Sequence, residues 1–138
     1  MKIESWFIYS LLALFTWGIW AFLPKLSVKY INPKSAIVYE AIGGLLIGLI
    51  VLLLIGFKVE REPHGMLFAF LTGVTAIGGG LFFLYAVNQG KATVVIALTA
   101  LYPLIGILLT FLFLHESITL KQGIGMALAL VAILFMTV

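Results

Sequence analysis

Five long apolar segments separated by short polar connections divide the chain. The segments free of Asp, Glu, Lys and Arg are Ser5–Pro24, Ala41–Phe57, Gly65–Gly90, Ala92–Leu114 and Gln122–Val138. A helix needs about 20 apolar residues to cross the hydrocarbon core of a bilayer, which is about 30 Å thick. Four segments approach or exceed that length, and the last can begin near Thr119. The pattern predicts an all-α integral membrane protein with five transmembrane helices.

Proline and capping residues in the connections set the predicted helix boundaries. Pro24 can bend or end the first helix, and Pro33 suits the first turn of the second. Glu62–Gly65 has the composition of a turn, and Thr119 with Gln122 has capping-box spacing. The predicted helices span about residues 4–23, 33–57, 66–87, 92–114 and 119–138. We expect them to form one transmembrane domain, residues 1–138.

The composition excludes most soluble functions. Hydrophobic residues make up 64% of the chain and charged residues 9%, against about 45–50% and 25% in soluble domains. The basic residues occur singly at segment ends, which favours anchoring to membrane lipid and argues against nucleic-acid binding. There is no cysteine, and the two histidines lie in connections. No nucleophile elbow, phosphate loop or zinc motif is present, so we expect no enzyme activity, metal or cofactor.

The Lys and Arg residues are divided equally between the two sides of the membrane. With five spans, one side carries Lys2, Lys58, Arg61 and Lys121, and the other carries Lys25, Lys29, Lys34 and Lys91. Orientation is set mainly by an excess of Lys and Arg in the short loops on the cytoplasmic side. A chain with no excess is therefore expected to insert in both orientations.

Glu40 is the one ionisable residue that falls well inside a predicted span. Because an intramembrane carboxylate is costly, it usually faces a cavity or a partner. One interpretation is a carboxylate that exchanges protons or binds cations at the edge of a cavity. The other is an interfacial Glu that reaches toward Lys34 or Lys29, since it lies only about 10 Å beyond the start of its helix. Its helix also carries Gly44 and Gly48 in the GxxxG spacing that allows close helix packing.

Two tryptophans of the first helix share one face. Trp17 and Trp20 are three residues apart, whereas Trp6 lies at the expected position of an interfacial aromatic belt. Trp17 lies about 16 Å further along the helix axis, near the middle of the membrane. Lining of a cavity is one explanation for this position, and packing against helices or lipid is the other.

Two segments contain residues that disfavour a regular helix. Thr99 and Tyr102 share a stripe of the fourth helix, with Pro103 at its middle. Pro103 has no N–H to donate to the carbonyl near Thr99, and interrupted helices recur at transporter binding sites. Gly79 lies in a run of three glycines, which weakens the third helix. Each feature is either a conformational hinge or an ordinary kink or packing surface.

Several short motifs, taken in order, resemble a known family. They are Trp17-Gly18, Pro24-Lys25, Pro33, Leu101-Tyr102-Pro103, and Glu116 with Gly123 and Gly125. Their order and spacing relative to five helices resemble the EamA domain of the drug/metabolite transporter superfamily. Typical members have ten helices in two domains of inverted orientation and transport small metabolites or drugs.

The resemblance implies that this chain corresponds to one EamA-like half of an inverted-repeat transporter. It places Trp17, Trp20, Tyr102 and Pro103 near a central cavity. Many members have a basic residue near the position of Glu40, so no role for Glu40 follows from the resemblance. A complete pathway in the manner of the family would require a second chain.

These observations together predict a small transporter in the cell inner membrane. We expect a small organic solute to move by alternating access through an antiparallel, dual-topology homodimer, with Glu40 as a candidate for proton coupling. The predicted binding residues are Trp17, Trp20, Thr99, Tyr102 and Glu40. The alternatives are a membrane scaffold or accessory subunit that does not transport, and one half of a heterodimeric transporter.

Overall fold

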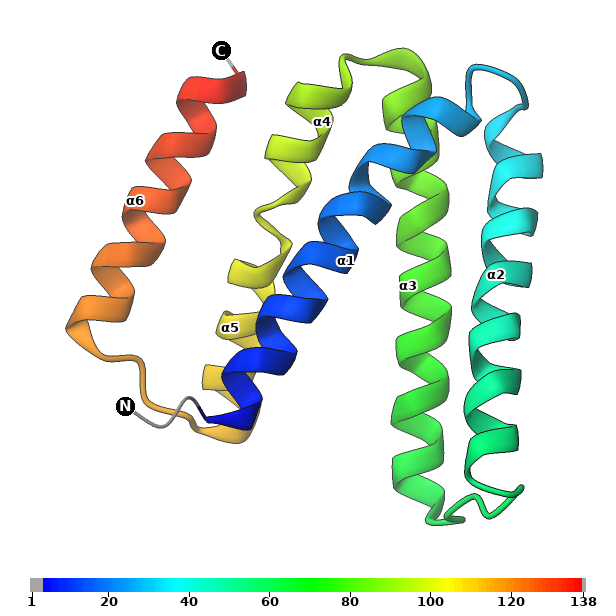
Figure 1. The fold of residues 1–138 in the computed structure, drawn as a ribbon. Helices are drawn as coiled ribbons and strands as arrows, with labels where there is room; N and C mark the ends of the chain where they lie inside the picture. The colour runs from blue at the N-terminus through cyan, green and yellow to red at the C-terminus, as the bar shows by residue number, and fades with distance from the viewer. Residues whose placement is uncertain (1–3, 138) are drawn as a thin grey trace. The chain divides into compact units, whose positions relative to one another are not determined.

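The computed structural model describes residues 4–137, which form helices joined by short connections. The helices are α1 (Ser5–Ser27), α2 (Pro33–Leu54), α3 (Pro63–Gln89), α4 (Ala92–Thr99), α5 (Tyr102–Leu114) and α6 (Leu120–Thr137) (Figure 1). α4 and α5 are the two halves of one apolar segment, Ala92–Leu114. Within the described residues, four segments are long and apolar enough to cross a membrane, and α6 is a shorter apolar helix. The predicted all-α class with five helical segments is confirmed.

The helices form two compact units that divide after Gln89. The N-terminal unit contains α1, α2 and α3, and its contacts join α3 to both other helices. The C-terminal unit contains α4, α5 and α6, with α4 against α6. In the N-terminal unit, α2 runs antiparallel to α3 (Figure 1).

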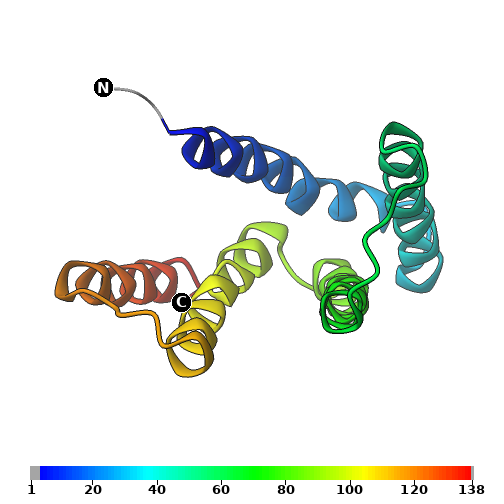
Figure 2. The ribbon, with the colours of Figure 1, turned by 90° about the horizontal axis from the view of Figure 1, so that it is seen from below.

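The core of the N-terminal unit lies at one end, where α1 ends, α2 begins and α3 ends. Its buried residues are Pro24, Pro33, Ala36, Gly80, Phe83, Leu84 and Val87. Seen from below, α2 and α3 diverge toward the connection between them, residues 55–62 (Figure 2). The three helices are therefore held together chiefly at the end where α1 passes into α2.

α1 continues beyond the predicted end at residue 23. It includes Pro24 and ends at Ser27. Proline removes one backbone hydrogen bond from a helix, but the Pro24 ring is buried in the core, and the N–H of Val28 donates to the Pro24 carbonyl at 3.0 Å. Packing after the proline therefore allows the helix to continue for a further turn.

Both ends of α2 are defined by local hydrogen bonds. Asn32 Oδ1 accepts the N–H of Ser35 at 2.9 Å, as expected of an N-cap. α2 ends at Leu54, three residues before the predicted end, because Gly56 and Phe57 adopt left-handed φ values of 61° and 60°. Left-handed residues close a helix by redirecting its last N–H groups to free carbonyls.

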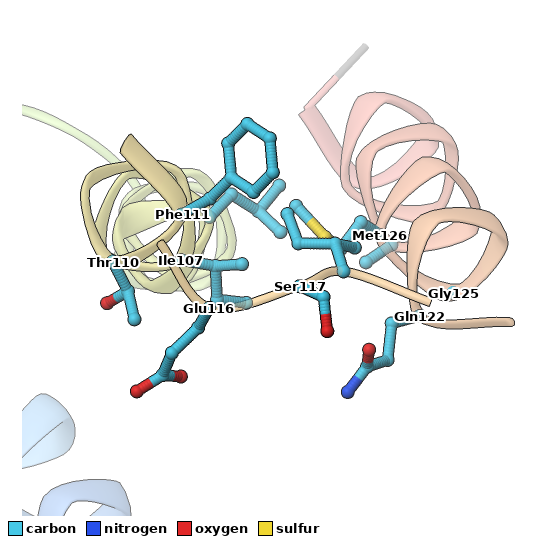
Figure 3. A pocket seen from close by; sticks show the side chains of 11 residues that line it. Ile107, Thr110, Phe111, Glu116, Ser117, Gln122, Gly125 and Met126 are labelled. Carbon is cyan, nitrogen blue, oxygen red and sulfur yellow. The ribbon is translucent and has the colours of Figure 1, made fainter. Parts of the chain in front are cut away.

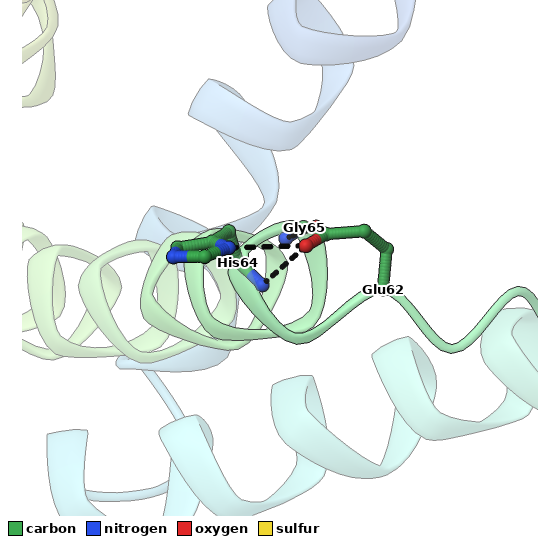
Figure 4. Close-up of polar contacts among 3 residues, drawn as sticks. All are labelled: Glu62, His64 and Gly65. Carbon is green, nitrogen blue, oxygen red and sulfur yellow. Dashed lines mark hydrogen bonds and ion pairs between the residues drawn. The ribbon is translucent and has the colours of Figure 1, made fainter.

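α3 begins at Pro63, three residues before the predicted start. The segment interpreted as a turn is an N-cap: one oxygen of the Glu62 carboxylate accepts the N–H of His64 at 3.2 Å, and the other accepts the N–H of Gly65 (Figure 4). His64 Nδ1 lies 3.0 Å from the same carboxylate. The Gly65 N–H, then the His64 side chain and the His64 N–H, lower the pKa of Glu62 below its ordinary value.

The predicted fourth helix is interrupted at Ala100 and Leu101, just before Pro103. Pro103 lies in the first turn of α5 and has no N–H for the Thr99 carbonyl. The break predicted from this proline is confirmed. It follows that α4 and α5 can change their mutual angle more easily than two halves of a continuous helix.

The predicted capping box at the start of α6 is confirmed. The N–H of Thr119 donates to Gln122 Oε1 at 2.8 Å, and the N–H of Gln122 donates to Thr119 Oγ1 at 3.3 Å. These reciprocal bonds satisfy N–H groups that a helix start leaves without partners. They fix the point at which the connection after α5 becomes α6.

Candidate functional site

A hydrogen bond between α1 and α2 lies at the centre of the candidate site. Trp20 Nε1 donates to Glu40 Oε1 at 2.8 Å. Among the residues that the structure describes, no ion pair joins Glu40 to Lys29 or Lys34. The observed partner is an uncharged indole on a different helix, and both interpretations of Glu40 stay predictions.

α3 holds both of these side chains in place. The Trp20 ring stacks on Phe83, with ring centroids 5.2 Å apart and planes inclined by 28°, and Phe83 is only 6% exposed. A Cβ atom added to Gly80 would lie 3.2 Å from Glu40 Oε1 and 3.3 Å from Ile37 Cδ1. The Glu40 carboxylate therefore lies so close to α3 that a side chain at position 80 would require Glu40 or Ile37 to shift by a few tenths of an ångström. We call Trp20, Glu40, Gly80 and Phe83 the Trp20–Glu40 cluster.

The position of the cluster determines its electrostatics. Glu40 lies about 10 Å along the axis from the start of α2, taking 1.5 Å per residue, and its side chain is half-buried. An ionised carboxylate at this depth is costly unless a proton or a cation neutralises it. The indole N–H orients the carboxylate but, being uncharged, does not neutralise it. The cluster is therefore suited to taking up a proton or holding a cation.

Lys25 forms a second link between α1 and α3. Its Nζ donates to the carbonyl oxygen of Val87, one of the last four carbonyls of α3, which have no partner within the helix. A cation at the carboxyl end of a helix is also favoured by the helix dipole. This bond fixes α1 against α3 one to two turns beyond Trp20.

The other predicted residues of the N-terminal unit lie on open surfaces. Trp17 is 59% exposed. A Cβ atom added to Gly44, Gly48 or Gly79 would meet no atom of the described chain within 4 Å, apart from its own helix backbone. α3 runs through Gly79 without a break. The packing role of the two α2 glycines and the hinge role of Gly79 stay predictions.

Thr99, Tyr102 and Pro103 belong to the C-terminal unit. The Thr99 hydroxyl donates to the carbonyl of Val95 at 2.8 Å, and Tyr102 is 60% exposed. Thr99 thus uses its hydroxyl within α4, while the Tyr102 ring projects from the start of α5. Their shared wall with the tryptophans of α1 stays a prediction.

A groove lies between α5 and α6 at the end where the two helices are connected (Figure 3). Its lining includes the apolar Ile107, Phe111 and Met126 and the polar Glu116, Ser117 and Gln122. Glu116 is in the connection and is exposed, and Gln122 already bonds to Thr119. The groove therefore offers a solvated carboxylate, in contrast to the half-buried carboxylate of the Trp20–Glu40 cluster.

Sequence reasoning missed the contributions of Phe83, Gly80 and Lys25. The signal was present in α3, where the buried residues Gly80, Phe83, Leu84 and Val87 follow the i, i+3, i+4, i+7 spacing of one helix face. In an apolar transmembrane helix every face is hydrophobic, so this spacing does not stand out in the sequence. Gly79, the predicted hinge, is one residue away and lies on a different face of α3.

Comparison with known proteins covers both units. A model of the EamA-like transporter family matches residues 4–138. An uncharacterized protein of Methanocaldococcus jannaschii is 30% identical over 131 residues, which cover 95% of this chain and 95% of that protein. No solved structure matches the chain. The matched region includes every residue of the Trp20–Glu40 cluster.

Proposed function

Because the chain belongs to the EamA-like transporter family and is a multi-pass membrane protein, we propose that it moves a small organic solute across the membrane by alternating access. Family members are typically not enzymes. The observation that carries the proposal is the Trp20–Glu40 cluster, which presents a carboxylate and an aromatic ring within the spanning helices. Such groups bind and release a solute and need no covalent step.

We propose further that two copies assemble as an antiparallel homodimer in the cell inner membrane. Inverted repeats let one bundle become inward-open or outward-open when its two halves exchange roles, and antiparallel copies supply two such halves. The four-to-four division of Lys and Arg supports insertion in both orientations. The open surfaces at Gly44 and Gly48 support close packing against another helix.

In this proposal the aromatic residues Trp17, Trp20 and Tyr102 form the wall of the solute site, with Thr99 beside them. The break before Pro103 permits rocking of α5 relative to α4. Glu40 exchanges protons as the solute binds and leaves.

Dual insertion is tested with reporters fused to the C-terminus, alkaline phosphatase for the outside and a fluorescent protein for the cytoplasm. Both fusions should be active. Lys29→Gln and Arg61→Gln form a matched pair, because Lys29 and Arg61 lie on opposite sides of the membrane in the predicted topology. Each substitution removes one of the four basic residues on its side. Lys29→Gln should move the C-terminus outward, and Arg61→Gln should move it into the cytoplasm. A wild-type signal from one side only would remove the dual-insertion proposal and favour a partner chain of opposite topology.

Transport is tested with purified protein reconstituted into liposomes. Radiolabelled amino acids, sugars and amines are offered under an imposed pH gradient, with empty liposomes as control. Glu40→Gln should abolish the pH dependence of uptake while the dimer persists, and Glu60→Gln, in the exposed connection before α3, should leave it unchanged. Absence of flux for every solute, together with co-purification of a larger membrane protein, would favour the scaffold function.

A further inference from the structure

The two oxygens of the Glu40 carboxylate are used unequally. Oε1 accepts the Trp20 N–H, and within the described residues no hydrogen bond reaches Oε2. A carboxylate can accept about four hydrogen bonds, and a half-buried one is poorly served by water. Oε2 is therefore an acceptor that lacks a donor.

No charged group of the N-terminal unit supplies that donor. On α1, Lys25 bonds to the Val87 carbonyl of α3. On α2, Lys34 is exposed, and among the described residues it forms no ion pair with Glu40. Within the described unit, no basic side chain forms an ion pair with Glu40, so a cationic donor to Oε2 would come from outside the unit.

Trp20 adds an aromatic surface beside the free oxygen. One face of its ring is covered by Phe83, but the side chain is still 38% exposed. Tryptophan is the aromatic residue that attracts cations most strongly, and it also packs well against apolar groups. Because Trp20 is bonded to the same carboxylate, its indole is the aromatic surface that a ligand of Oε2 would use.

We infer that the Trp20–Glu40 cluster binds a protonated primary or secondary amine that carries an apolar or aromatic body. The ammonium N–H donates to Oε2 and neutralises the carboxylate, and the body lies against the indole. A quaternary ammonium supplies the charge without the N–H, and an alcohol supplies a donor without the charge, so each satisfies only half of the site. This inference names the solute class of the proposed transporter, although the binding step itself does not depend on transport.

Binding is tested on the purified full-length protein in detergent by isothermal titration calorimetry at pH 8. The probes are 2-phenylethylamine, its N,N,N-trimethyl derivative and 2-phenylethanol, which share one aromatic body. A charge-assisted hydrogen bond corresponds to about a tenfold to hundredfold difference in affinity. The amine should bind at least about tenfold more tightly than either analogue. Equal binding of the amine and the trimethyl derivative would overturn the inference, as would equal binding of the amine and the alcohol.

Variants locate the site. Glu40→Gln should remove the preference for the amine, whereas Glu60→Gln should keep it. Trp20→Phe removes the indole donor to Glu40 and should weaken amine binding. Trp6→Phe is the matched control: Trp6 is also on α1, and its indole donates to Glu4, so this substitution should have no effect on amine binding. Circular dichroism and gel filtration confirm folding of each variant. An unchanged preference in folded Glu40→Gln would overturn the inference.

The two proposals fail in distinguishable ways. Glu40-dependent amine binding without flux in liposomes would support the amine site and refute transport. Flux of other solutes with no amine preference would support transport and refute the amine site.

Discussion

Replacing Gly80 by alanine tests how closely α3 approaches the Glu40 carboxylate. The new Cβ would lie 3.2 Å from Glu40 Oε1 and 3.3 Å from Ile37 Cδ1. Both atoms must move by a few tenths of an ångström, and Oε1 cannot move freely because it is bonded to Trp20, which Phe83 holds by stacking. Gly79→Ala is the matched control, since its Cβ would meet no described atom within 4 Å outside its own helix.

The two substitutions should change the free energy of unfolding by different amounts. Both gain about 1 kcal/mol of helix propensity. In Gly80→Ala the new Cβ also crowds Glu40 and Ile37, and overpacking of this kind typically costs about 1–3 kcal/mol. If Glu40 moves away instead, its hydrogen bond from Trp20 is lost, which costs about 1.5–3 kcal/mol for a bond to a charged group. We therefore expect Gly80→Ala to be less stable than Gly79→Ala by about 1–3 kcal/mol.

Unfolding of the purified protein in mixed micelles with increasing SDS, followed by circular dichroism, measures this difference. Tryptophan fluorescence reports whether the surroundings of Trp20 change as well. In a Glu40→Ala background the penalty at Gly80 should shrink, with a coupling free energy of about 0.5 kcal/mol or more. Equal stabilities for Gly80→Ala and Gly79→Ala, or a coupling near zero, would refute the close approach.

Three further predictions concern other parts of the chain. Lys25→Met should destabilise the N-terminal unit by about 1.5–3 kcal/mol in the same SDS titration, because a helix-end carbonyl loses a charged donor, whereas Lys25→Arg should retain most of the stability; a silent Lys25→Met would contradict the link. The Gly65 N–H and His64 hold the pKa of Glu62 below its ordinary value of 4.5, so the α3 cap contributes fully above pH 4.5 and is lost as the pH falls through the lowered folded-state pKa. A carboxyl ¹³C titration should show a midpoint below 4.5 that rises in His64→Ala, and a wild-type midpoint at or above 4.5 would exclude the cap. Pro103→Ala restores a backbone donor worth about 1 kcal/mol and should slow transport without weakening solute binding, and an unchanged rate would remove the hinge role.

The helices could be predicted from the sequence because membrane-spanning segments are defined by length and the absence of charge. Local chemistry also predicted the capping box at Thr119 and the break before Pro103. The observed helix boundaries differ from the predicted ones where two local sequence signals conflict. Glu62 acts as a helix cap, although the composition of Glu62–Gly65 indicates a turn. Gly56 and Phe57 are left-handed just after the end of α2, although a bulky residue such as Phe57 rarely adopts that conformation.

The cluster could be predicted only in part. Glu40 and Trp20 stand out in the sequence because a carboxylate and an indole are unusual inside a span. Their pairing depends on how α1 and α2 both pack against α3, which no single segment encodes. The contributions of Phe83 and Gly80 were hidden because hydrophobic periodicity does not distinguish the buried face of a helix that is apolar on all sides.

The bond between Lys25 and the Val87 carbonyl has a consequence for biosynthesis. Synthesis proceeds from the N-terminus, so α1 and its lysine reach the membrane before the carboxyl end of α3 exists. During that interval α3 does not yet hold the Lys25 ammonium, and its positive charge contributes to the orientation of α1. Once α3 is complete, the same ammonium is held at a helix end, and reversal of α1 would require the bond to break. If the chain inserts in both orientations, as proposed above, each molecule would acquire its orientation before this bond forms, and folding would then preserve that orientation.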